Sequence, residues 1–117
     1  MDAPMERALR VDVQRQPDVV VVTVSGSATM EMSAELNDRL IETVQDPIPL
    51  LVIDLAELDF VCSEGLGAIV NAHLKCMRQG GCIRLAGPTK PILELLDLTR
   101  LSKLFSIFPT VDEAIKA

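Results

Sequence analysis

The sequence has 117 residues, of which 49% are hydrophobic, so its length predicts one domain, residues 1–117, with a sizeable apolar core. A net charge of −6, without a long cluster of Lys or Arg, argues against nucleic acid or an anionic membrane surface as a partner. Three cysteines and one histidine cannot form a disulfide framework or a zinc site, so we expect no metal and no cofactor.

The expected location is the cytoplasm. The first ten residues carry acidic side chains and lack an apolar signal core. The longest apolar stretch, around residues 48–53, is too short to span a bilayer. An odd number of cysteines, read as free thiols, also suits a reducing compartment.

The first part of the chain predicts a β-hairpin followed by a helix. Apolar and polar residues alternate over residues 8–16, and a β-branched run over residues 19–26 follows a Gln-Pro-Asp turn. Leucine, isoleucine and valine then recur at helical spacing over residues 33–46, with Ser33 as the expected N-cap. Two prolines, at positions 47 and 49, end this helix.

The rest of the chain alternates strands with helices. Strands are predicted at residues 50–55, 82–87 and 103–108, and helices at residues 63–79, 89–99 and 110–117. This order predicts an α/β fold with a mixed, mainly parallel sheet of about five strands, flanked by about four helices. The chain begins with an N-terminal β-hairpin.

The predicted helix at residues 63–79 has the clearest pattern. Gly80 and Gly81 supply the left-handed stop at its end, while Thr89 and Thr110 are expected to cap the two later helices. Six residues at helical spacing are expected to form its buried stripe: Leu66, Ile69, Val70, His73, Leu74 and Met77. We expect His73 to flank this stripe and to make one hydrogen bond.

Ser63 stands where the central helix begins, and two roles are open to it. As an N-cap its hydroxyl would accept a bond from an early backbone N–H, which stabilises a helix by about 1 kcal/mol. As an exposed serine it could instead accept a phosphate, whose added charge the helix N-terminus tolerates. The residue pattern alone leaves both interpretations open.

Catalysis by Ser63 or Cys62 is disfavoured, because the required base is missing. His73 lies ten residues along the same helix, about 15 Å away at 1.5 Å per residue, whereas a base must come within roughly 3 Å. The frame "VCSEG" also lacks the first glycine of a nucleophile elbow. Cys62, at a helix start, remains a candidate redox-sensitive thiol. The carboxylates at positions 54, 57 and 59 are expected to be solvated loop charges.

Four stretches carry a resemblance to a known family: "VSG" at residues 24–26, "LLVIDLAELDFVCSEGLGAI" at 50–69, "GG" at 80–81 and "LLDLTRLSKLFSIFPTVDEAI" at 95–115. In these stretches the chain resembles a STAS domain of the anti-sigma factor antagonist type. The resemblance extends over nearly the whole chain and implies a STAS-type mixed sheet flanked by helices. It also implies a regulatory protein rather than an enzyme.

The resemblance implies a phosphorylation switch. Such antagonists bind an anti-sigma factor that is itself a serine kinase, thereby freeing a sigma factor; phosphorylation releases them and a PP2C-type phosphatase resets them. Ser63 matches the acceptor position, and a weak homodimer is compatible with the resemblance. The partner-binding residues that it implies are Thr29, Asp59, Cys62, Ser63, Glu64, Gly65, Leu66 and Gly67.

Three positions depart from the family's usual pattern. Cys62 replaces an aspartate, Glu64 replaces a serine or threonine, and no acidic residue directly follows Gly26. Those acids often help to engage the kinase, and Glu64 would give the surface a standing negative charge. The alternative function is therefore a phosphorylation-independent STAS scaffold or interaction module in a signalling or transport assembly.

Overall fold

The computed structural model describes residues 7–117, which form a six-stranded sheet with helices on both of its faces. Strands β1 and β2 form the expected antiparallel hairpin, and every other strand pair is parallel. The strand order is β1-β2-β3-β5-β6, with β4 pairing beside the end of β2. The strands are β1 (Arg10–Arg15), β2 (Val20–Ala28), β3 (Leu50–Asp54), β4 (Leu58–Val61), β5 (Cys82–Ala86) and β6 (Ser106–Phe108).

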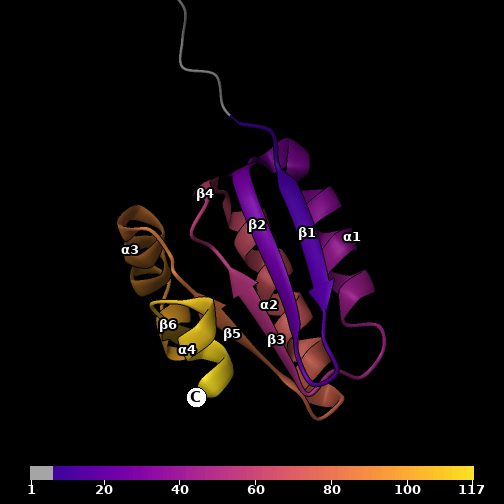
Figure 1. Ribbon diagram of the computed structural model, residues 1–117. Coiled ribbons are helices and arrows are strands. Elements are labelled where there is room, and N and C mark those ends of the chain that lie inside the picture. Colours follow the sequence, from indigo (N-terminus) through magenta and orange to yellow (C-terminus); the bar gives the residue numbers. More distant parts are fainter. Residues whose placement is uncertain (1–6) are drawn as a thin grey trace, which may run out of the picture.

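Helices cover the sheet in two layers, as Figure 1 shows: α1 and α2 lie together on one side, and α4 lies on the other. The strand β3 contributes to both apolar clusters, because Leu51 and Ile53 point to the α1–α2 side while Val52 points to the α4 side. This explains its uninterrupted apolar sequence. The helices are η1 (Met30–Met32), α1 (Ser33–Thr43), α2 (Ser63–Arg78), α3 (Lys90–Leu98), η2 (Leu101–Lys103) and α4 (Val111–Lys116).

The predicted fold class is confirmed, including the hairpin, the mixed sheet and the four helices. Strand β4 differs from the sequence-based prediction, because the acidic residues before Ser63 indicate a loop. It forms because its backbone pairs with β2, as in Gly26 with Leu58 and Ala28 with Val61. The expectation that the first ten residues lack a signal sequence depends mainly on residues 1–6, which lie outside the described range.

The expected caps have mixed outcomes. Thr110 caps α4, with its side chain accepting a hydrogen bond from the Glu113 N–H at 3.1 Å, and Gly80 follows α2 with φ +89°. Thr89 occupies the expected N-cap position of α3, but its side chain makes no capping hydrogen bond. Ser33 is not the N-cap of α1, since Met32 occupies that position and the Ser33 hydroxyl donates to the Met30 carbonyl.

The buried stripe expected on α2 is wrong in part. Leu66, Ile69 and His73 are buried, whereas Leu74 is 43% exposed and Met77 is 52% exposed. The helix instead buries the side that carries its small residues, including Ala68, Ala72 and Cys76. Small side chains allow α2 to approach the sheet and α1 closely, so the buried face is turned toward them.

No helix among residues 7–117 combines the length and the apolar character that crossing a membrane requires.

Candidate functional site

Strand β4 and the start of α2 bring several of the predicted partner-binding residues to one end of the sheet. The Cys62 N–H donates to the Ala28 carbonyl at 2.9 Å, so Thr29 lies beside the junction that leads into α2. Asp59 lies in β4, and Ser63 is the first residue of α2. Pairing of β4 with β2 therefore assembles a surface from segments more than thirty positions apart in sequence.

Ser63 is exposed and does not cap the helix. Cys62 is the N-cap: it has extended backbone angles, φ −83° and ψ 172°, and its Sγ accepts from the Gly65 N–H at 3.4 Å. The hydrogen bond that the structure gives the Ser63 hydroxyl is to Glu64 Oε1, at 3.3 Å. Cys62 thus takes the capping role, one of the two roles that the sequence left open for Ser63, and the serine hydroxyl lies on the surface.

Glu64 gives the start of α2 a negative charge. Hydrogen bonds from its own backbone N–H, and then from the side chains of Cys62 and Ser63, hold the pKa of Glu64 below its ordinary value, although desolvation opposes them. The positive end of the helix dipole favours the same ionised form. A carboxylate therefore lies directly beside the Ser63 hydroxyl.

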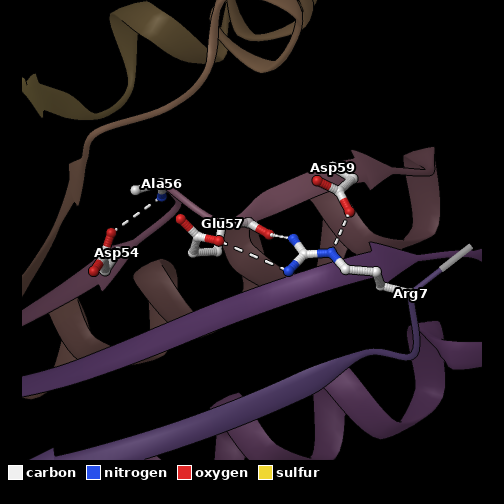
Figure 2. A network of polar contacts seen from close by, with 5 residues as sticks. All are labelled: Arg7, Asp54, Ala56, Glu57 and Asp59. Carbon is white, nitrogen blue, oxygen red and sulfur yellow. Dashed lines mark hydrogen bonds and ion pairs between the residues drawn. The ribbon is translucent and has the colours of Figure 1, made fainter.

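Arg7 clamps the segment before β1 onto β4, as Figure 2 shows. Its Nε lies 2.7 Å from Asp59 Oδ2, its Nη1 lies 3.7 Å from Glu57 Oε1, and its guanidinium also donates to the Glu57 carbonyl. The Arg7 carbonyl accepts from the Ser27 N–H at 3.1 Å. The hydrogen bond from Arg7 lowers the pKa of Asp59.

The acidic residues before Ser63 are therefore not all the solvated loop charges that the sequence predicted. Asp59 and Glu57 pair with Arg7, and Asp54 accepts from the Ala56 N–H at 3.1 Å, closing the turn after β3 (Figure 2). Arg7 and Asp59 are each about half exposed, 50% and 51% by side chain, so solvent screens the pair. No sequence pattern links the two, because they are 52 residues apart.

The site also contains apolar side chains that the sequence analysis did not single out. Phe60, three residues before Ser63, is 48% exposed, and Met30, next to Thr29, is 68% exposed. Alternation would not have identified Phe60, because it places Phe60 on the same face of β4 as the buried Leu58, whereas Asp59 and Phe60 are both exposed between buried Leu58 and Val61. Gly65 and Leu66 are themselves buried and support this surface from beneath, whereas Gly67 is partly exposed.

His73 has no role at this site. It is buried, its Nδ1 accepts from the Ile83 N–H at 3.3 Å, and its ring lies 4.6 Å from that of Phe105. Burial lowers the pKa of His73. Within residues 7–117, no group of three or more His, Cys, Asp or Glu side chains is arranged to hold a metal ion.

Comparisons with known proteins agree with this architecture. The chain is 27% identical over 110 residues to the anti-sigma F factor antagonist of Paenibacillus polymyxa, covering 93% of this chain and 92% of that protein. It is 23% identical over 99 residues to the anti-sigma-B factor antagonist of Bacillus subtilis, covering 85% and 90%. A solved structure, an anti-sigma factor antagonist from Mycobacterium paratuberculosis, superposes with a TM-score of 0.85 at 30% identity, covering 99% and 97%.

A family model described as the STAS domain matches residues 10–114, which include the whole sheet and the start of α2. The chain therefore belongs to the STAS domain family.

Proposed function

We propose that this protein is an anti-sigma factor antagonist, a regulatory protein rather than an enzyme, that docks on a serine-kinase anti-sigma factor and is released when Ser63 is phosphorylated. The curated relatives are named for antagonism of anti-sigma factors. The observation that carries the proposal is the exposed Ser63 hydroxyl. Because Cys62 caps α2, this hydroxyl is not needed for capping. Exposed Phe60 and Met30 beside it supply apolar contact area.

The charges at the site account for release. A phosphate adds about −1.5 to −2 charges at pH 7. At Ser63 it would lie at the positive end of α2, so the fold tolerates it. The same group would stand beside the ionised Glu64 and make the docking face strongly negative. Like charges or unpaired anions in a desolvated interface cost several kcal/mol, so the modified protein dissociates.

The wider cycle follows from the same switch. A PP2C-type phosphatase would remove the phosphate and restore docking. The proposed location is the cytoplasm, where the three free cysteines stay reduced and the kinase has ATP. The partner-contacting residues of the proposal are Thr29, Asp59, Cys62, Ser63, Glu64 and Gly67, supported by Gly65 and Leu66.

The test is phosphorylation of the purified protein. Each serine-kinase anti-sigma factor of the same organism is incubated with it and Mg·ATP, and intact mass and peptide mapping locate any phosphate. We expect one phosphate, on Ser63. Ser63→Ala should take no phosphate, whereas Ser106→Ala, which changes another exposed serine on β6, is the matched control and should be modified like wild type. A chain that binds a partner tightly yet takes no phosphate would contradict the switch and favour the scaffold function.

A further inference from the structure

The first turns of α2 contain two glycines, and the fold explains only one of them. A Cβ at Gly65 would lie 2.7 Å from Val61 Cγ2, so a larger residue would clash with β4. A Cβ at Gly67 would meet no described atom within 4 Å outside its own helix backbone. Glycine inside a helix weakens folding about two- to fivefold relative to alanine. Nothing that the structure describes around Gly67 offsets that loss.

Gly67 lies on a side of α2 that is unusually apolar for a surface. At 100° per residue, Ser63, Gly67, Val70, Leu74 and Met77 fall within about 80° of one another around the helix axis. Val70 is partly buried, while Leu74 and Met77 are 43% and 52% exposed. These five residues are called here the outer face of α2; the buried small residues of the helix lie on its opposite side, although Val70 also packs against the core cluster.

The size of a typical interface decides how much of the outer face a partner at Ser63 would cover. Stable interfaces bury about 800 Å² per partner, which corresponds to a disc of about 16 Å radius. With a rise of 1.5 Å per residue, Gly67 lies about 6 Å from Ser63 along the helix, Leu74 about 16 Å and Met77 about 21 Å. A footprint centred on Ser63 therefore covers Gly67, reaches Leu74 at its rim and excludes Met77.

We propose that the kinase lays an apolar segment along the outer face of α2 from Ser63 to Leu74, and that the bare backbone at Gly67 is where this segment approaches most closely. The inference rests on the proposed function, because it is the kinase active site that must reach Ser63. Gly67 thereby becomes a specificity-determining position. The absence of a side chain at Gly67 lowers the stability of the folded protein, but in the complex it lets the kinase approach the helix backbone closely.

The decisive variant is Gly67→Ala, examined with the partner kinase in the presence of Mg·ADP for binding and Mg·ATP for phosphorylation. We expect its unfolding equilibrium to shift about two- to fivefold toward the folded state. We expect its dissociation constant to rise about tenfold and Ser63 phosphorylation at low protein concentration to slow by the same factor. Gain of stability with loss of binding is a combination that a merely structural glycine cannot produce.

Two further variants measure how far the contact extends. Leu74→Ser should weaken binding about threefold, whereas Met77→Ser is the matched control and should bind like wild type. Equal losses in both would overturn the footprint centred on Ser63. Self-association of the wild-type chain that either variant abolishes, measured by sedimentation, would assign the outer face to a second copy and also overturn the inference.

The inference and the proposed function fail in different ways. If wild type binds the kinase and is phosphorylated on Ser63, and Gly67→Ala behaves identically, the inference is wrong while the proposed function stands. If wild type is neither bound nor phosphorylated by any serine-kinase anti-sigma factor of its organism, the proposed function is wrong and the inference falls with it.

Discussion

Two helix starts in this protein use their hydroxyl side chains differently. At α4, Thr110 is the N-cap, and its Oγ1 accepts from the Glu113 N–H at 3.1 Å. At α2, Cys62 is the N-cap, and Ser63 follows it as an exposed first residue. A capping hydroxyl is committed to the fold, whereas a hydroxyl one position later is available to another protein. Thr110 therefore stabilises the start of its helix, whereas Ser63 is exposed at the start of its helix without stabilising it.

The largest expected effect is on binding, from Ser63→Asp. A permanent negative charge at the proposed docking face should weaken binding to the partner kinase at least thirtyfold, equivalent to about 2 kcal/mol. Isothermal titration calorimetry measures this. The free energy of unfolding should stay near that of wild type, because an anion at a helix N-terminus is tolerated.

The matched control for that change is Thr110→Asp on α4. Aspartate is a good N-cap, so this variant should fold normally, and its new charge lies at a different helix start. Its binding to the kinase should equal that of wild type. Equal weakening by the two variants would mean that net charge, rather than charge at Ser63, controls docking.

The next effect is on stability, from removing each hydroxyl. Thr110→Ala should lower the free energy of unfolding by about 1 kcal/mol, since it deletes a cap. Ser63→Ala should leave it nearly unchanged, because Cys62 caps α2. Urea denaturation of the two variants and wild type checks this. A loss in Ser63→Ala as large as in Thr110→Ala would show that Ser63 supports the helix after all.

His73, unlike Ser63, is a polar side chain that is buried in the core, where it stabilises the fold. Burial lowers its pKa, so the unfolded chain binds the proton more tightly than the folded one. Stability is therefore full above the ordinary pKa of 6.5 and falls as the pH drops through 6.5 toward the lower folded value. Between pH 6.5 and 5.5 the loss should not exceed about 1 kcal/mol.

The readout for His73 is the slope of stability against pH, measured by urea denaturation at several pH values. His73→Asn keeps an acceptor that can face the Ile83 N–H but removes the titrating group. Its slope between pH 7.5 and 5.5 should be flatter than that of wild type, whatever its absolute stability. Identical slopes would assign the pH dependence to other groups.

The smallest expected effect is from Arg7→Gln, which removes the clamp on β4. The partners are about half exposed, so the change in the urea midpoint should be slight at low salt and should vanish at high salt. Lys103→Gln, an exposed cation on η2, is the control. A large loss that persists in high salt would show that Arg7 positions β4 through its hydrogen bond to the Glu57 carbonyl.

Much of the fold could be predicted from the sequence because its signals are local. Alternation and a turn predicted the hairpin, an apolar run predicted β3, and Gly80 marked the end of α2. The position of Ser63 at a strand-to-helix junction was also predictable, and so was the STAS resemblance that the family model confirms.

The remainder depended on contacts distant in sequence. Strand β4 exists because β2 pairs with it, and the Arg7–Asp59 pair joins positions 52 residues apart. The outward turn of Leu74 and Met77 was missed because helical spacing alone does not tell which side of α2 packs inside. That choice depends on how closely the small residues of α2 can approach the sheet and α1.

The sequence by itself determined the order of elements and the placing of one serine at the start of the central helix, because hydrophobic periodicity and turn residues act over a few positions. Only the tertiary structure decided which atom caps that helix and which side of it faces solvent. Backbone pairing at Ala28 positions Cys62 as the cap, and packing area selects the buried side. The identity of the cap and the choice of the buried side both depend on contacts between residues distant in sequence, and these contacts exist only in the folded chain.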